Sequence, residues 1–356
     1  CPLLFVTFLC ASLCHCVSLG TADDLINLFN KATGNTLKTD IEVTADLDFS
    51  GSGLTLPLGV SSNGACVAFS GVFHGNGHSI KGLRMNNTNN AGYKNAGLFC
   101  SLKDATVENL VIDSSCSFTG YSAGALSVSV TGSLTVTNTT NKAAVSRGYR
   151  LGGFIGHVQN LKQPTVISFE DCVNGGNVQG SNNSGGGFIG FIGSNTKMTM
   201  TISNSTNNGN VAGSKNNVGG FVGHIYSNTN MTMTISNSTS NGNVTGSYEV
   251  GGLVGYISRN TNMTIIISHS AKNGIVTGSG NCVGGFVGEI YSNTNMTMTI
   301  SNSTSNGSVT WSSNVGGFVG YISWNTNMAM TISNSINNGI VTGRIWDVGG
   351  FVGRID

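Results

Sequence analysis

Polar and apolar residues alternate along much of the second half of the chain. In residues 219–226, Phe221 and Ile225 fall on the same face of an extended segment. A polar turn follows, after which Met231 and Met233 alternate with threonines. A period of two is typical of β-strands, so we expect these apolar residues to point into a common core.

A glycine motif repeats this unit. Each of the six copies from Gly152 to Gly316 is followed 22 residues later by an Asn-Gly pair, as from Gly219 to Asn241, so variation in repeat length is confined to the return segment. Such confinement is expected where stacked strands fix one part of a coil and a solvent-facing loop forms the other. The pattern Gly-Gly-Phe/Leu-Val/Ile-Gly begins at Gly152, Gly186, Gly219, Gly251, Gly284, Gly316 and Gly349, and degenerate copies begin at Ala96 and Ala123.

This spacing predicts an all-β fold. We expect a right-handed parallel β-helix, or β-solenoid, of about nine rungs of ~33 residues, with three short strands in each turn. Stacked at about 4.8 Å per rung, the rungs would form a rod of roughly 43 Å. An antiparallel sandwich is the competing fold, but it requires hairpins at a spacing of about 8–12 residues.

The front of the chain predicts a cap. Thr21 and Asp24 form the pattern of a capping box, so a short amphipathic helix is expected to cover the open end of the stack. Residues 3–19 are apolar and are followed by Gly20, which is typical of a signal peptide; a buried first strand is the alternative. The expected organisation is a signal peptide at 1–20, a cap and first strands at 21–90, and the repeats at 91–356.

Composition narrows the classes of partner. Only 9% of residues are charged, with 16 Lys and Arg against 15 Asp and Glu. This balance gives no excess of basic residues to bind nucleic acid, so we do not expect nucleic acid as a partner. No later apolar run is long enough to span a bilayer. With the predicted leader, these features indicate a secreted or cell-surface protein.

The cysteines divide unevenly. Four of the nine lie in the predicted leader, and the spacing of the rest matches no metal or redox pair of the C-x-x-C type. In a secreted protein one pair among Cys66, Cys100 and Cys116 could be bridged. Cys282 has no obvious partner.

The order of these elements resembles GLUG-motif β-helix proteins, which occur on bacterial and protist surfaces. The resemblance rests on "TADDL", "DIEVTADLDF", "FSGVFHGNGHSIKGL", "AGLF", "ATVENLVI" and then tandem "GGFVG", and it covers about residues 21–356. It implies a right-handed β-helix with frequent surface or adhesin roles and with no shared catalytic residues. The chain departs from the family pattern at His74, where Asp is usual, and in its Asn- and Thr-rich repeats.

A β-helix can also cleave polysaccharides, which requires paired carboxylates or a calcium site with a basic residue. From residue 186 onward the acids lie on separate rungs at unrelated phases of the repeat, so we expect them not to converge. They are Glu249, Glu289, Asp347 and Asp356. We therefore predict no catalytic residue, no cofactor and no metal site, and the chain is predicted not to be an enzyme.

The front of the chain is richer in acids, but these alternate along one strand and are predicted to form a solvated face. His74 and His78 flank a Gly-rich turn and are expected to be turn and surface residues. The front acids are Asp40, Glu42, Asp46 and Asp48.

Many asparagines stand in N-glycosylation sequons, although their number is roughly what this Asn, Ser and Thr content gives by chance. They are Asn86, Asn138, Asn182, Asn204, Asn230, Asn237, Asn243, Asn262, Asn295, Asn302 and Asn306.

The outward positions beside the core isoleucines predict a binding face. Each of the five rungs from the motif at Gly186 to the motif at Gly316 places one large aromatic there, at alternating positions, and aromatic faces supply contact area at low entropic cost. The competing interpretation is that these rings stack across rungs for stability alone. We call this set the aromatic stripe: Tyr226, Tyr256, Tyr291, Tyr321 and Trp324.

Together these features favour an extracellular structural or adhesive protein whose partner is a glycan or a protein of a host or neighbouring cell surface. A polysaccharide-acting β-helix enzyme is the rival function. Because residue 356 falls inside a rung, we also expect either that the natural chain continues or that rods associate head to tail through the open rung.

Overall fold

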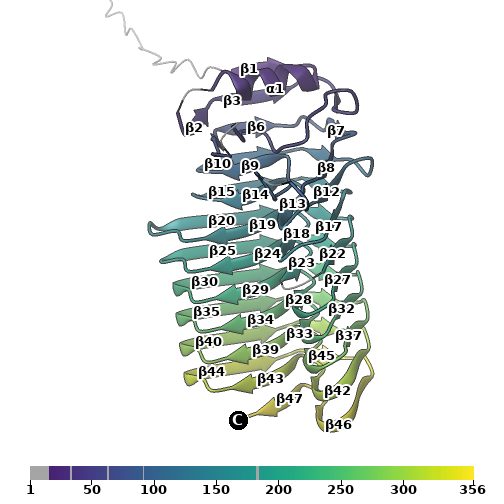
Figure 1. Cartoon of the computed structure of the whole chain (residues 1–356). Helices are drawn as coiled ribbons and strands as arrows, with labels where there is room; N and C mark the ends of the chain where they lie inside the picture. Colours follow the sequence, from purple (N-terminus) through teal and green to yellow (C-terminus); the bar gives the residue numbers. More distant parts are fainter. Residues whose placement is uncertain (1–15, 33, 62–63, 91, 182–183) are drawn as a thin grey trace, which may run out of the picture.

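The computed structural model describes residues 16–32, 34–61, 64–90, 92–181 and 184–356, and shows a parallel β-solenoid of about nine turns with ~33-residue rungs. The named strands pair in parallel within four long sheets that run the length of the stack (Figure 1). The predicted all-β solenoid is therefore confirmed.

Sheets A and B carry the strands that begin each repeat. In stack order, sheet A contains β1 (Cys16–Leu19), β3 (Asp40–Val43), β6 (Val72–His74), β10 (Ala105–Glu108), β15 (Leu134–Thr137), β20 (Thr165–Glu170), β25 (Met198–Ser203), β30 (Thr229–Ser236), β35 (Thr261–Ser268), β40 (Thr294–Ser301) and β44 (Thr326–Ser333). Sheet B contains β2 (Thr36–Lys38), β5 (Ala68–Ser70), β9 (Phe99–Leu102), β14 (Ser127–Val130), β19 (Ile155–Gln159), β24 (Ile189–Gly193), β29 (Val222–Tyr226), β34 (Val254–Ser258), β39 (Val287–Tyr291), β43 (Val319–Ser323) and β47 (Val352–Ile355).

Sheets C and D complete each turn. Sheet C contains β4 (Leu47–Asp48), β7 (Ser79–Lys81), β11 (Val111–Ile112), β16 (Thr140–Asn141), β21 (Val173–Asn174), β26 (Thr206–Asn207), β31 (Thr239–Ser240), β36 (Ala271–Lys272), β41 (Thr304–Ser305) and β45 (Ile336–Asn337). Sheet D has two strips joined at β42 (Val309–Gly316), which also pairs with β46 (Val341–Gly349). One strip is β8 (Arg84–Asn86), β12 (Ser117–Thr119), β17 (Ala144–Ser146), β22 (Val178–Gly180), β27 (Val211–Gly213), β32 (Val244–Gly246) and β37 (Val276–Gly278); the other is β13 (Ser122–Gly124), β18 (Arg150–Gly152), β23 (Gly185–Gly186), β28 (Asn216–Gly219), β33 (Tyr248–Gly251) and β38 (Asn281–Gly284).

A typical turn contains five strands, β29 to β33, rather than the three that the sequence predicts. The second strip of sheet D accounts for one missed strand, because the residues just before each motif glycine pair with the next rung. The two-residue strands of sheet C account for the other, since two residues are too few to show a period. The three longer strands were predicted correctly.

The glycine motif allows close stacking of rungs. A Cβ at Gly220 would lie 2.0 Å from the carbonyl oxygen of Gly252 on the next rung, so no larger residue fits. The Phe or Leu at the third position of the motif points inward, and neighbouring rings contact one another through the core, as Phe188 and Phe221 do with centroids 5.0 Å apart. Met231 and Met233 of β30 are buried as predicted.

Buried polar residues form a second internal column beside this core. Asn195, Asn228, Asn260, Asn293 and Asn325 each occupy the turn between sheets B and A, and the Nδ2 of each of the first four donates to the Oδ1 of the next at 2.9–3.0 Å. Their second amide hydrogens bond backbone carbonyls, as from Asn260 to Ser258. The ladder thereby satisfies polar groups that the turn would otherwise bury without partners.

The predicted cap is present. Helix α1 (Ala22–Asn30) lies at the top of the stack (Figure 1), and its capping box is formed by Thr21 and Asp24, whose Oγ1 and Oδ2 lie 2.7 Å apart. Leu25 and Phe29 are buried against the first rungs. Residues 16–19 of the predicted leader form β1, which pairs with β3, and residues 1–15 lie outside the described residues.

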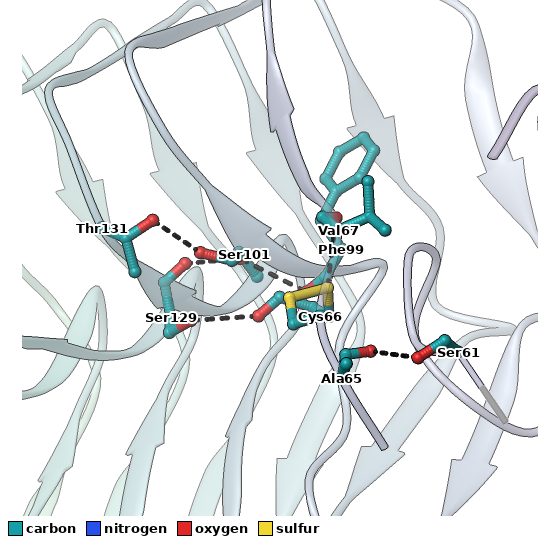
Figure 2. The surroundings of a disulfide bond; sticks show 10 residues. Ser61, Ala65, Cys66, Val67, Phe99, Ser101, Ser129 and Thr131 are labelled. Carbon is teal, nitrogen blue, oxygen red and sulfur yellow. Dashed lines mark hydrogen bonds between the residues drawn. A yellow bond between two sulfur atoms is a disulfide. The ribbon is translucent and has the colours of Figure 1, made fainter. Parts of the chain in front are cut away.

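One disulfide joins adjacent rungs near the cap, between Cys66 and Cys100 (Figure 2). The sequence left three cysteines open for this pair, and the structure selects these two. Cys116 and Cys172 are free and buried, and burial raises their thiol pKa to about 11 and about 12. Cys282 is also free and buried.

Candidate functional site

The aromatic stripe lies mainly on the outer face of sheet B. Strand pairing stacks His224, Tyr256, Glu289 and Tyr321 in one column, while Tyr226 and Tyr291 occupy the next outward column. The four tyrosines are half-buried. Strand register therefore brings them to one surface, although they are about 30 residues apart in sequence.

Trp324 occupies the turn that follows β43, where its backbone is left-handed with φ 57°. Its side chain is 76% exposed, more than any other large hydrophobic residue described. The equivalent position one double repeat earlier is Arg259, with φ 56°. This turn position therefore projects long side chains at the edge of the stripe.

Neighbouring rings of the stripe touch across rungs. His224 stacks on Tyr256 with ring centroids 4.9 Å apart, and Tyr256 and Tyr291 are 6.4 Å apart. Phe191, which is only 8% exposed, extends the row through an edge contact with His224 at 5.5 Å. Such contacts stabilise the stack and also hold the exposed ring edges in fixed positions.

Three arginines complete the stripe, and sequence reasoning missed them. Arg150 lies 4.4 Å from the ring centroid of Phe191, Arg259 lies 5.9 Å from that of Tyr226, and Arg354 lies 5.6 Å from that of Tyr321. Cation–π contacts of this kind are electrostatic and give the face a positive component. The signal was weak because each arginine comes from a different rung.

Two acids converge beneath this surface, which contradicts the expectation that the late acids stay apart. Glu249 lies beside Glu289 because β33 packs against β39. The approach is close, since a Cβ on Gly288 would lie 2.6 Å from the backbone of Glu249. Burial raises the pKa of Glu289 to about 7. Burial, together with the charge of Glu289, raises the pKa of Glu249 to about 8.

Other polar groups surround this acid pair. The thiol of Cys282 contacts Glu289, and burial raises the pKa of that thiol. His224 is held between Asn217, at 3.2 Å from Nδ1, and Ser258, at 3.1 Å from Nε2. Burial lowers the pKa of His224 to about 3, so the ring is neutral near pH 7. The cluster is therefore uncharged wherever its acids hold their protons.

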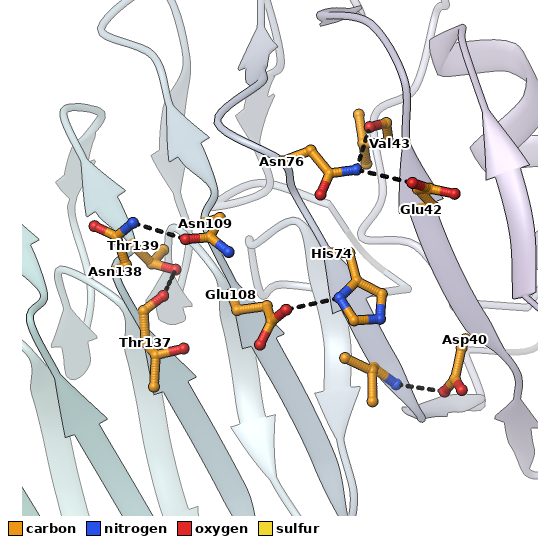
Figure 3. Close-up of polar contacts among 11 residues, drawn as sticks. Asp40, Glu42, Val43, His74, Asn76, Glu108, Asn109, Thr137, Asn138 and Thr139 are labelled. Atoms are coloured by element: carbon orange, nitrogen blue, oxygen red, sulfur yellow. Dashed lines mark hydrogen bonds and ion pairs between the residues drawn. The ribbon is translucent and has the colours of Figure 1, made fainter.

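A second polar group lies at the front of sheet A (Figure 3). His74 Nδ1 and Glu108 Oε1 are 2.7 Å apart across adjacent rungs, and Asn76 donates to the carbonyl oxygen of Val43 at 3.0 Å. Glu42 is exposed, as are Asp46 and Asp48 on the neighbouring turn, in agreement with a solvated face. His78 lies 3.7 Å from Asp46, so both predicted surface histidines pair with acids.

An open cavity of about 520 Å³ adjoins these acids. Lys38 and Asp40 line it from the first rungs, and Lys103 and Asp104 from a later rung. Asp40 accepts a hydrogen bond from the Val72 amide at 2.8 Å, so its carboxylate is already engaged in the backbone. Within the described ranges, no three His, Cys, Asp or Glu residues are grouped so as to hold a metal ion.

The sequon asparagines mostly stand in stacked columns. Nδ2 of Asn262 donates to Asn230 and that of Asn295 to Asn262, each at 3.0 Å. A parallel ladder in the Asn-Gly turn includes Asn306, and Asn243 accepts from a backbone amide on the next rung. Asn204, Asn237 and Asn302 share a turn position with φ 49°; Asn138 donates to Asn109, Asn86 accepts from Thr88, and Asn182 lies outside the described residues.

Comparison with known proteins finds one distant structural likeness. No family model matches the chain, and no curated protein matches it, so the likeness to GLUG-motif proteins stays a prediction. A crystal structure of a Bacteroides ovatus protein, described as a "putative immunoglobulin A1 protease", is similar with a TM-score of 0.49 and 17% identity. The match covers 92% of this chain and 83% of that chain.

This comparison corrects one prediction. The prediction that the chain is not an enzyme is contradicted by the description of this neighbour as a "putative immunoglobulin A1 protease". At 17% identity and a TM-score of 0.49, the likeness assigns no reaction to this chain. In the described part of the chain, no helix is both long and apolar enough to cross a membrane.

Proposed function

We propose that this chain is an extracellular or cell-surface repeat protein that presents an extended binding surface, with the aromatic stripe as its contact face. The observation that carries the proposal is the row of rings on sheet B, in which His224, Tyr256 and Tyr291 contact one another in turn. Arginines lie against the rings of Tyr226 and Tyr321, and Trp324 stands exposed at the edge. The ligand is a sugar chain or a protein on a host or neighbouring cell.

The chemistry of the stripe supports such a ligand. Exposed tyrosine rings offer apolar faces to the C–H groups of sugars and phenol hydroxyls to their oxygens. The rings are fixed by their neighbours, so little side-chain entropy is lost on binding. Arg259, whose Nη1 lies 3.4 Å from the Tyr226 hydroxyl, adds a hydrogen-bond donor at the rim.

A linear ligand suits the geometry. Parallel strands repeat at about 4.8 Å, so aromatic positions in alternate rungs recur at roughly 10 Å along the rod. A chain molecule could therefore contact several rungs at once, and weak contacts would add through multivalency. The predicted dependence on several tyrosines follows from this arrangement.

The test replaces Tyr226, Tyr256, Tyr291 and Tyr321 together with threonine. Binding of the wild-type protein and the variant is measured on a glycan array and on intact cells, and folding is checked by circular dichroism. The matched control is Tyr121→Thr with Tyr149→Thr, two exposed rings whose centroids lie 4.6 Å apart in the bends that precede β13 and β18.

The proposal expects the fourfold variant to lose at least tenfold in affinity while the control binds as the wild type does. Unchanged binding by a folded fourfold variant would show that the stripe is scaffold. Equal loss in both variants would also refute the proposal, because it would mean that exposed tyrosines in general, rather than this face, carry the binding.

A further inference from the structure

The outer face of sheet A is a second ordered surface, distinct from the aromatic stripe. From β25 to β44, inward Met and Ile side chains alternate with small outward residues that stack in four straight columns. The columns are Asn230, Asn262, Asn295 and Asn327; Thr199, Thr232, Thr264, Thr297 and Ala329; Thr201, Thr234, Ile266, Thr299 and Thr331; and Ser203, Ser236, Ser268, Ser301 and Ser333.

From β30 to β44 these columns carry no charged residue, and the asparagine column is preceded on the β25 rung by Lys197, which occupies the same left-handed turn position. Between β25 and β40 the two central columns contain eight outward positions. Seven of these are threonines, and the eighth is Ile266, which retains a methyl group. Thr199 and Thr297 are exposed and Thr232 and Thr234 are half-exposed. Within the described residues, the hydroxyls of the latter two form no hydrogen bond to protein and so face water.

The edge of the array is fixed by the amide ladder. Asn262 donates to Asn230 at 3.0 Å, Asn295 to Asn262 at 3.0 Å, and Asn327 to Asn295 at 3.1 Å. Ladders of this kind hold a sheet flat against its tendency to twist. The threonines therefore stand on a regular and rigid two-dimensional grid.

The grid has two repeat distances. Adjacent strands lie about 4.8 Å apart, and outward residues along one strand lie about 6.7 Å apart. The oxygen atoms on a prism face of hexagonal ice repeat at two similar perpendicular spacings. Each threonine offers a hydroxyl that can anchor one water molecule and a methyl group that orders the water beside it.

We propose that the threonine face of sheet A binds ice. The inference goes beyond the proposed function, because it concerns another sheet and another class of ligand. A neutral face matches a neutral lattice, whereas a charged partner would find no complementary group among these columns. Protein partners prefer aromatic and arginine anchors, which these columns lack.

A second copy of the chain fits this face less well. Five strands and four columns span roughly 25 Å by 20 Å, or about 500 Å². A stable protein interface buries about 800 Å² on each partner. An ice surface needs no such minimum of apolar area, since every column adds the same water contacts.

The test uses the full chain produced without N-glycans, because glycans on Asn230, Asn262 or Asn295 would cover the grid. Thermal hysteresis and ice-crystal shape are measured by nanolitre cryoscopy for three proteins: the wild type, Thr232→Lys with Thr297→Lys, and a control. The control is Thr245→Lys with Thr277→Lys, which adds the same charges to sheet D. Circular dichroism confirms that all three are folded.

The proposal expects faceted crystals and measurable hysteresis for the wild type and the control, and loss of both for the sheet A variant. Absence of hysteresis and crystal shaping in the wild type would overturn it. The proposal would also be overturned if the wild type bound crystalline chitin or cellulose, or formed dimers in sedimentation, and the sheet A substitutions abolished that association but left thermal hysteresis unchanged.

Discussion

The buried asparagine ladder allows a quantitative test of what holds the rungs together. In Asn260→Ala, the Oδ1 that accepts from both the backbone amide and the Nδ2 of Asn228, at 2.9 and 3.0 Å, is removed. Both donors are buried, and an orphaned buried donor costs about 1–3 kcal/mol. The substitution should therefore lower the free energy of unfolding by about 2–6 kcal/mol.

Asn273→Ala is the matched control. Asn273 donates to Asn241 at 2.8 Å and accepts from Asn306 at 2.8 Å in a similar ladder, but that ladder is exposed and water can replace each bond. A surface substitution of this kind is expected to cost no more than about 0.5 kcal/mol. Comparing the two variants thus separates the effect of burial on stability from the effect of the number of hydrogen bonds lost.

Urea unfolding followed by circular dichroism measures the difference, and hydrogen exchange locates it. Because each rung contacts only its neighbours, loss of protection in Asn260→Ala should centre on β29, β34 and β39. Equal destabilisation by both variants, or none by either, would refute the argument that this column stabilises the stack by satisfying buried groups.

Three further predictions follow from buried groups and close contacts. The folded-state pKa of Glu249 (about 8) and Glu289 (about 7) lies above the ordinary 4.5, so the folded protein holds extra protons in this window. The free energy of unfolding should fall as pH rises from 4.5 to 8, by up to about 1.4 kcal/mol per pH unit for each carboxyl. In Glu249→Gln with Glu289→Gln, the urea midpoint should lose this dependence on pH. Gly288→Ala should lower the melting temperature, because its Cβ would lie 2.6 Å from backbone atoms, whereas Gly350→Ala, with no atom within 4 Å, should not. Burial lowers the pKa of Lys272 from 10.5 to about 7, so Lys272→Met should raise the urea midpoint at pH 8, and this gain should shrink toward pH 10 as the wild-type lysine loses its cost.

The repeat made the fold predictable. Motif glycines such as Gly220 recur because only a residue without Cβ fits between rungs, and that constraint is visible as a fixed spacing in the sequence. The alternation of Met231 and Met233 with threonines fixed which face of β30 is buried. Strands of two residues carry no such period, so the number of strands in each turn was underestimated.

The candidate site was only partly predictable. Tyr226 and Tyr256 differ by two positions in repeat phase, so both side chains point to the same outward face of sheet B when the rungs stack. Glu249 and Glu289 differ in phase and meet only because the corner between β33 and β39 folds two phases together. Arg259 reaches the ring of Tyr226 from a left-handed turn position that no periodic pattern marks.

The stripe, the threonine face and the ladders all depend on the register of the rungs, which cysteine cross-linking tests directly. Tyr226 pairs with Ser258, whereas Tyr256 pairs with His224. In-register Cα atoms lie about 4.8 Å apart and residues offset by two positions about 8 Å apart, while a disulfide requires about 4.4–6.8 Å. Rapid oxidation of Tyr226→Cys with Ser258→Cys, mapped by mass spectrometry, is expected, together with little oxidation of Tyr226→Cys with Tyr256→Cys. Preferential cross-linking of the second pair would contradict the register and every surface built on it.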